Sequence, residues 1–138
     1  MILAVALMSA QAVTASALPA DDAEIVVTAR RLSNRWSGQI TTENNENTCK
    51  TIRSTGDDEF DTIGCTAMLK CWPEFFPRIE TALKAEIATG RIKTRADMDK
   101  TNRRPPFRKM WVDMGKCIQP KIRDGIRAEI KRRKADGK

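Results

Sequence analysis

Four cysteines constrain the fold of this 138-residue chain more than any other feature: Cys49, Cys65, Cys71 and Cys117. An even number of cysteines without close C-x-x-C pairs favours disulfides over a structural zinc site. The chain also contains no His that could complete a zinc site. Two disulfides in a chain of this length are typical of an oxidising compartment. We therefore expect the cysteines to be structural, with no metal or other cofactor.

The spacing of the cysteines favours one pairing. Cys65 and Cys71 are six residues apart in a segment expected to be helical, so their side chains point about 240° apart around the axis. One of them can face a hairpin that carries Cys49, and the other can face a neighbouring helix. We predict the disulfides Cys49–Cys65 and Cys71–Cys117. The alternative is Cys49–Cys71 with Cys65–Cys117.

The first 17 residues resemble a leader for export. Residues 1–17 are uncharged and consist mainly of apolar and small side chains. Ala15-Ser16-Ala17 is a small-x-small cleavage site, although the usual Lys or Arg before the apolar core is absent. The predicted organisation is a signal peptide at 1–17, a flexible segment at 18–34 and a single helical domain at 35–138. The expected location is the periplasm or the medium.

The predicted fold class is mainly α, within α+β: a small N-terminal β-hairpin, followed by a disulfide-linked bundle of about four helices. Residues 36–42 and 48–53 form two short alternating segments, and the turn-rich residues 43–47 lie between them. Beyond Gly56 the apolar residues recur at helical spacing.

Prolines and a glycine predict where these helices end. Pro73 and Pro77 indicate a break and a restart, because proline lacks the N–H that a helix interior needs. Gly90 is placed to stop the restarted helix. Pro120 predicts two helices, or one kinked helix, in the last stretch. That stretch carries four isoleucines at intervals of four residues, which we expect to pack on the helix of Phe76, Ile79 and Leu83: Ile118, Ile122, Ile126 and Ile130.

Two segments resemble the proteins that energise outer-membrane transport. The run Glu24-Ile-Val-Val-Thr-Ala-Arg-Arg31 resembles the TonB box of TonB-dependent receptors, an extended segment that adds a strand to TonB. The resemblance implies a TonB-like envelope partner that binds four residues: Ile25, Val26, Val27 and Thr28. Residues 49–65 resemble a strand–turn–helix portion of the TonB C-terminal domain. The N-terminal pattern is also similar to that of small secreted sphingomonad-type proteins of unknown role.

Basic residues are concentrated at the C-terminal end. The whole chain has a net charge of +7, whereas residues 103–138 alone hold thirteen basic and four acidic residues, a net charge of +9. Such a segment attracts anions, and we expect anionic lipid or lipopolysaccharide as a partner. The candidate anion-binding residues are Arg123, Arg127, Lys131, Arg132, Arg133 and Lys134. Aromatic residues for base stacking are scarce there, so nucleic acid is not an expected partner.

Catalysis has little support in the sequence, since the chain lacks His and Tyr. The densest acidic group, Asp57, Asp58, Glu59 and Asp61, fits the first turn of a helix, where the dipole favours negative charge. The expected function is that of a non-enzymatic envelope binding or interaction protein. One alternative is a small enzyme or enzyme inhibitor that uses the acidic 57–61 region. The other is a binder of anionic lipid or nucleic acid through the basic C-terminal helix.

Overall fold

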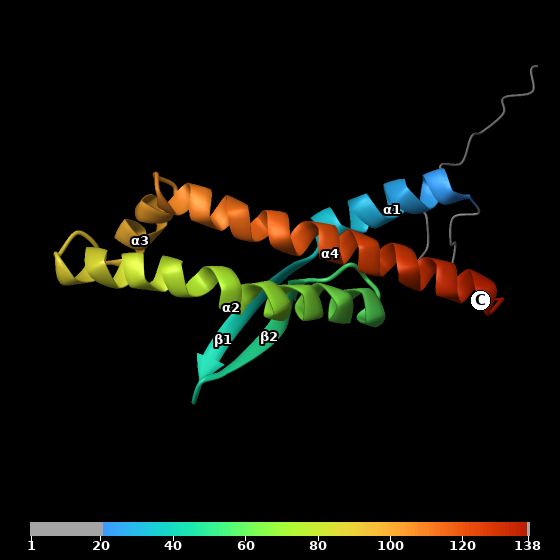
Figure 1. Ribbon diagram of the computed structural model, residues 1–138, viewed down its shortest axis with the longest axis horizontal. Helices are drawn as coiled ribbons and strands as arrows, with labels where there is room; N and C mark the ends of the chain where they lie inside the picture. The colour runs from blue at the N-terminus through green and yellow to red at the C-terminus, as the bar shows by residue number, and fades with distance from the viewer. Residues whose placement is uncertain (1–20, 138) are drawn as a thin grey trace, which may run out of the picture.

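The computed structural model describes residues 21–137, so the predicted signal peptide lies outside the described residues. Figure 1 shows two long helices, α2 and α4, that lie side by side, with α1 packed along α4 and a hairpin that projects away from the helices. The elements are α1 (Asp22–Arg35), β1 (Ser37–Glu43), β2 (Glu46–Arg53), α2 (Asp58–Ala88), α3 (Arg95–Asn102) and α4 (Phe107–Ala135). The predicted fold class is confirmed, with one of the four helices ahead of the hairpin.

Both predicted disulfides are present. Cys49 on β2 is joined to Cys65 on α2, and Cys71 on α2 is joined to Cys117 on α4. Cys65 and Cys71 therefore do face different neighbours, as their spacing on the helix requires. The alternative pairing is excluded. The two bonds connect the hairpin, α2 and α4 into one covalent frame.

The segment that we expected to be flexible and extended is helical over Asp22–Arg35. Asp21 caps the helix by accepting a hydrogen bond from the backbone N–H of Glu24 at 2.8 Å. Ile25, Ala29 and Ser33 are buried on one face, at intervals of four residues. This helical spacing, with the acidic cap before it, outweighs the β-branched residues that suggested a strand.

The expected helix breaks at the prolines are also absent. Helix α2 continues through Pro73 and Pro77, and α4 continues through Pro120. In each helix, fully or largely buried residues flank the prolines: Cys71 and Ile79 in α2, and Ile118 and Ile122 in α4. Tertiary packing on both sides thus offsets the hydrogen bonds that the prolines remove. Gly90 follows the end of α2 with φ of 77°, as predicted for a helix stop.

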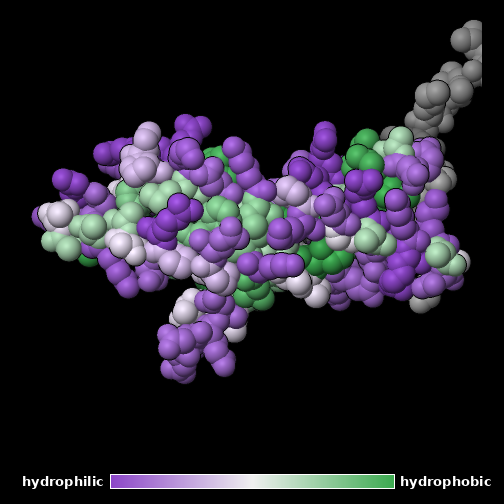
Figure 2. All heavy atoms as spheres, in the orientation of Figure 1, coloured by the Kyte–Doolittle hydropathy of each residue, from purple (hydrophilic) through white to green (hydrophobic). Residues whose placement is uncertain are grey.

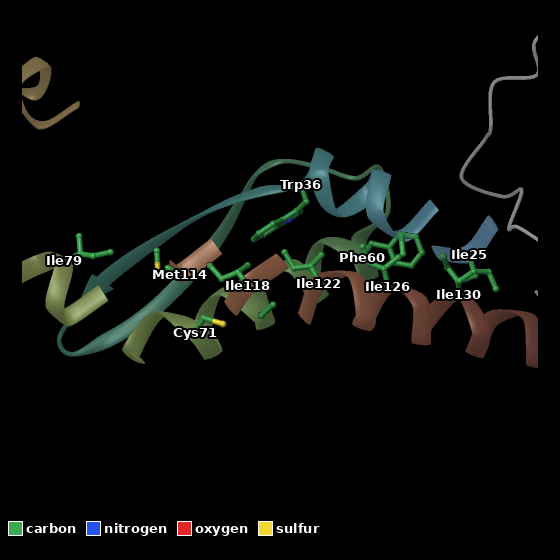
Figure 3. Packing of buried hydrophobic residues seen from close by; sticks show 12 residues of the cluster. Ile25, Trp36, Phe60, Cys71, Ile79, Met114, Ile118, Ile122, Ile126 and Ile130 are labelled. Atoms are coloured by element: carbon green, nitrogen blue, oxygen red, sulfur yellow. The ribbon is translucent and has the colours of Figure 1, made fainter. Parts of the chain in front are cut away.

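The isoleucines of α4 pack against a different part of the molecule from the one that we expected. Figure 3 shows Ile126 beside Phe60 and Ile130 beside Ile25, whereas Ile79 lies at the far end of the row, near Met114. Because α2 and α4 are antiparallel, the C-terminal half of α4 meets the N-terminal half of α2. Helix α1 covers the rest of the isoleucine stripe.

Trp36 connects three elements. Its indole ring lies between Gly38 on β1 and Gly64 on α2, and a Cβ on Gly64 would lie 2.4 Å from the ring. The ring N–H donates a hydrogen bond to Thr51 Oγ1 on β2 at 3.1 Å. The strands are joined by a two-residue turn, Asn44-Asn45, in which both φ angles are positive, as a hairpin of this length prefers. The buried ring thus fixes the base of the projecting hairpin to the helices.

This arrangement predicts that Gly64→Ala destabilises the protein by about 1–3 kcal/mol, because the added methyl group overlaps the Trp36 ring. Gly115→Ala in α4 is the matched control, since its Cβ would meet nothing within 4 Å. That change should be neutral or stabilising by up to about 1 kcal/mol, the helix preference of Ala over Gly. Urea unfolding of the oxidised chain measures both. Equal stability of the two variants would contradict the packing of Trp36.

Candidate functional site

Four basic side chains form a stripe along one side of α4. At about 100° per residue, Arg123 and Arg127 are one turn apart, and Lys116 and Lys134 fall within about 40° of them. Lys116 and Lys134 are exposed, and Arg123 and Arg127 are half-buried. These four residues are called the cationic stripe below. The isoleucines lie on the adjoining side of the helix, where α4 packs against α1 and α2, and the two sides meet near Ile130, seven residues from Arg123.

The two arginines of the stripe are not neutralised by the protein. Arg123 and Arg127 form no ion pair and no side-chain hydrogen bond with any residue in the range 21–137. A guanidinium group held on a helix without an acidic partner can donate several hydrogen bonds to the oxygens of a phosphate or carboxylate. Arg123 and Arg127 are therefore available to an external anion.

Arg133, by contrast, is held by contacts within the protein. Its guanidinium group donates two hydrogen bonds to the carboxylate of Asp57, at 2.7 and 2.9 Å, and lies 4.5 Å above the centre of the Phe60 ring. Its Nε also donates to Glu129 at 2.9 Å. The side chain is only 16% exposed. Arg133 thus joins the C-terminal turn of α4 to the N-terminal turn of α2.

The remaining predicted anion-binding residues differ in how far they are engaged. Arg132 pairs with Glu129 on its own helix, with Asp136 just after the end of that helix, and with Glu59 on α2. Lys131 lies 4.0 Å from Asp22, and both side chains are largely exposed. Of the six predicted residues, Arg123 and Arg127 are the ones without a partner in the described part of the chain.

The acidic 57–61 region has structural roles in this arrangement. Asp57 caps α2, accepting hydrogen bonds from the backbone N–H groups of Glu59 and Phe60. The hydrogen bonds from Arg133 and these backbone groups lower the pKa of Asp57. Burial raises the pKa of Asp61, but hydrogen bonds from Ser54 and Thr55 outweigh it, so its pKa is also lowered. Both carboxylates therefore stay ionised and hold the turn between β2 and α2.

The residues of the TonB-box-like segment lie on α1. Ile25 is buried in the core, Thr28 is half-buried, and Val26 and Val27 are 36% and 66% exposed. Addition of this segment to a partner sheet would require α1 to unwind and Ile25 to leave its contacts. Residues 49–65 run from β2 into α2. Binding to a TonB-like partner remains a prediction.

Comparisons with known proteins give no family for this chain. No family model, no curated protein and no solved structure matches it. Within residues 21–137 no helix is long and apolar enough to cross a membrane. The same part of the chain holds no group of His, Cys, Asp or Glu residues suited to a metal ion. The function of the chain is therefore inferred from its own residues.

Lys116 belongs to the stripe but is not one of the residues predicted from the sequence to bind anions. Lys116 lies before Pro120, where we expected the helix to be divided, so it was not grouped with Arg123 and Arg127. The helical spacing of seven residues between Lys116 and Arg123 could have identified it once α4 was taken as continuous.

The pairing of Arg133 predicts that Arg133→Gln destabilises the protein by about 1–3 kcal/mol, the usual cost of removing hydrogen bonds to a charged group. Arg127→Gln is the matched control, because it removes the same charge from the same helix at a position without a described partner. It should leave the midpoint of urea unfolding nearly unchanged. A similar loss in both variants would assign the effect to net charge and contradict the specific role of Arg133.

The pH dependence of this loss identifies its cause. A carboxylate with a lowered pKa stabilises the fold above its ordinary value, 3.8 for Asp57, and that stability disappears as the pH falls through its lowered value. The difference between wild type and Arg133→Gln should therefore be complete at pH 6 and shrink below about pH 4. A difference that is constant across this range would contradict the ion pair as its source.

Proposed function

We propose that this chain is a non-enzymatic protein of the bacterial envelope that binds phosphate-bearing lipid surfaces through the cationic stripe. The observation that carries the proposal is the unpaired state of Arg123 and Arg127 on one side of a rigid helix, in line with Lys116 and Lys134. Asp57, Glu59 and Glu129, which lie near this end, are paired with Arg132 and Arg133 instead. Basic groups near an anionic membrane surface each contribute about 1 kcal/mol to binding.

Helix α1 adds further basic residues to this part of the molecule. Helix α1 packs along α4 and carries Arg30, Arg31 and Arg35, none of which forms an ion pair or side-chain hydrogen bond within the described chain. Val27 on the same helix is 66% exposed. Basic residues next to exposed apolar side chains favour the interface of a lipid bilayer.

The proposed location is supported by the covalent frame. All four cysteines are paired, which is the state that an oxidising compartment maintains. The apolar leader at residues 1–17 and its small-x-small cleavage site also support export. A periplasmic protein would meet the phosphate groups of both lipid membranes that enclose it.

Export predicts that the chain recovered from the periplasm begins at Leu18, after cleavage behind Ala17. Intact mass spectrometry of that material, with and without reduction, measures the new terminus and the two disulfides together. Ala17→Arg is the control, since a large charged residue at the cleavage position should block processing. Recovery of a reduced cytosolic chain that still begins at Met1 would overturn the proposed location.

Lipid binding predicts that the exported chain co-sediments with vesicles containing anionic phospholipid and not with neutral vesicles. Changing Lys116, Arg123 and Arg127 together to Gln should lower the partition coefficient by roughly a hundredfold at low salt, since three basic contacts are lost. Binding of the wild type should weaken as salt shortens the range of the charges.

The matched control removes the same charge from the other end of the molecule. Lys84, Lys93 and Arg95 are exposed residues around the far end of α2, and their replacement by Gln should leave vesicle binding nearly unchanged. If both triple variants lose the same amount, net charge and not the stripe determines binding. If neither loses any, the lipid contact is elsewhere and the proposal is wrong.

A further inference from the structure

A groove runs between α2 and α4 on a different side of α4 from the cationic stripe. Its volume is about 410 Å³. Ile63 and Ala67 of α2 and Gly125 of α4 line it with apolar surface, and Thr62 and Thr66 lie along its edge. A volume in this range suits part of a small ligand, and an apolar lining with few polar groups is typical of such sites.

Gly125 allows the helices to close the bottom of this groove. A Cβ at Gly125 would lie 2.6 Å from Cγ2 of Ile63, so the two helices approach more closely here than a larger residue permits. The groove is therefore a surface channel with an apolar floor. Thr62 and Thr66 at its edge are exposed, so the channel is open to solvent on this side.

Both charged groups of the groove lie at one end. The disulfide joins Cys71 of α2 to Cys117 of α4. Ile63 and Gly125 lie against each other, and each is eight residues from the disulfide along its own helix. The same antiparallel register places Lys121 opposite Ala67, and Lys70 one turn closer to the disulfide. At 1.5 Å per residue, the channel extends about 12 Å from Thr62 to Lys70. It thus has one cationic end and one uncharged end.

Neither lysine is neutralised by the described protein. Lys70 and Lys121 are exposed, and within residues 21–137 neither forms an ion pair or a side-chain hydrogen bond. An ammonium group can donate up to three hydrogen bonds, and two such groups at one site favour a carboxylate with two acceptor oxygens. The remaining floor offers apolar contact and no charge, which favours a hydrocarbon chain.

We propose that this groove binds a single medium-chain fatty acid anion. The carboxylate would lie between Lys70 and Lys121, and the alkyl chain would lie along Ile63, Ala67 and Gly125 toward Thr62. This goes beyond binding at a lipid surface, because the ligand is one monomeric molecule and the residues are not those of the cationic stripe. Either proposal can hold while the other fails.

The test is calorimetric titration of the exported, oxidised chain with dodecanoate below its critical micelle concentration. Dodecanoate should bind, whereas dodecyltrimethylammonium, with the same chain and the opposite charge, should not. Thr66→Phe places a ring in the channel and should weaken dodecanoate binding by at least roughly tenfold. Lys70→Gln combined with Lys121→Gln should weaken it by a similar factor, through loss of the ion pairs.

Controls separate this site from the stripe. Lys84→Gln combined with Lys93→Gln removes the same charge elsewhere and should leave dodecanoate binding unchanged, as should the triple Gln variant of the stripe. Thr66→Phe should bind anionic vesicles like the wild type. Equal binding of dodecyltrimethylammonium, or wild-type affinity for dodecanoate in either groove variant, would overturn the proposal. Loss of vesicle binding alone, with dodecanoate binding intact, would count against the surface proposal and not against this one.

Discussion

The antiparallel contact between α2 and α4 is the constraint on which the rest of the structure depends. It is fixed at two places: the Cys71–Cys117 disulfide near the middle and the Arg133–Asp57 ion pair at one end. Between these points the isoleucines of α4 meet Phe60 and the N-terminal half of α2 (Figure 3). Two cross-links on one helix pair leave a single register, and that register places the cationic stripe and the groove.

The projecting hairpin depends on this pair for its stability. A two-stranded hairpin is marginal in water by itself. Here the Cys49–Cys65 disulfide and the buried Trp36 ring attach its base to α2, while Figure 2 shows that the projecting end is hydrophilic on the face in view. The strands past this base carry mostly exposed polar side chains, so they add little apolar area to the core.

Sequence reasoning succeeded where local geometry decides the outcome and failed where long-range packing does. The disulfides could be predicted because a six-residue step on a helix turns two side chains to different neighbours. Helix α1 was missed because Ile25, Val26 and Val27 favour strands locally, while the buried face of Ile25 and Ala29 becomes evident only against α4. The helix breaks expected at the prolines are absent for the same reason, because buried residues on both sides stabilise each continuous helix.

The functional residues show the limit of counting charges. The sequence shows a basic C-terminal end, but four of its six anion-binding candidates are adjacent cations whose roles differ only through their partners in space. Arg133 reaches α2 and is neutralised by Asp57, whereas Arg127, six residues earlier, forms no ion pair with any carboxylate of the described residues. Helix α4 therefore presents an isoleucine face in the core, a flank with unpaired arginines that borders this face near Ile130, and an opposite flank with Lys121 beside the groove. Because Lys121 and Arg127 point about 120° apart, a surface bound along the stripe does not cover the groove, and both sites can be occupied at once.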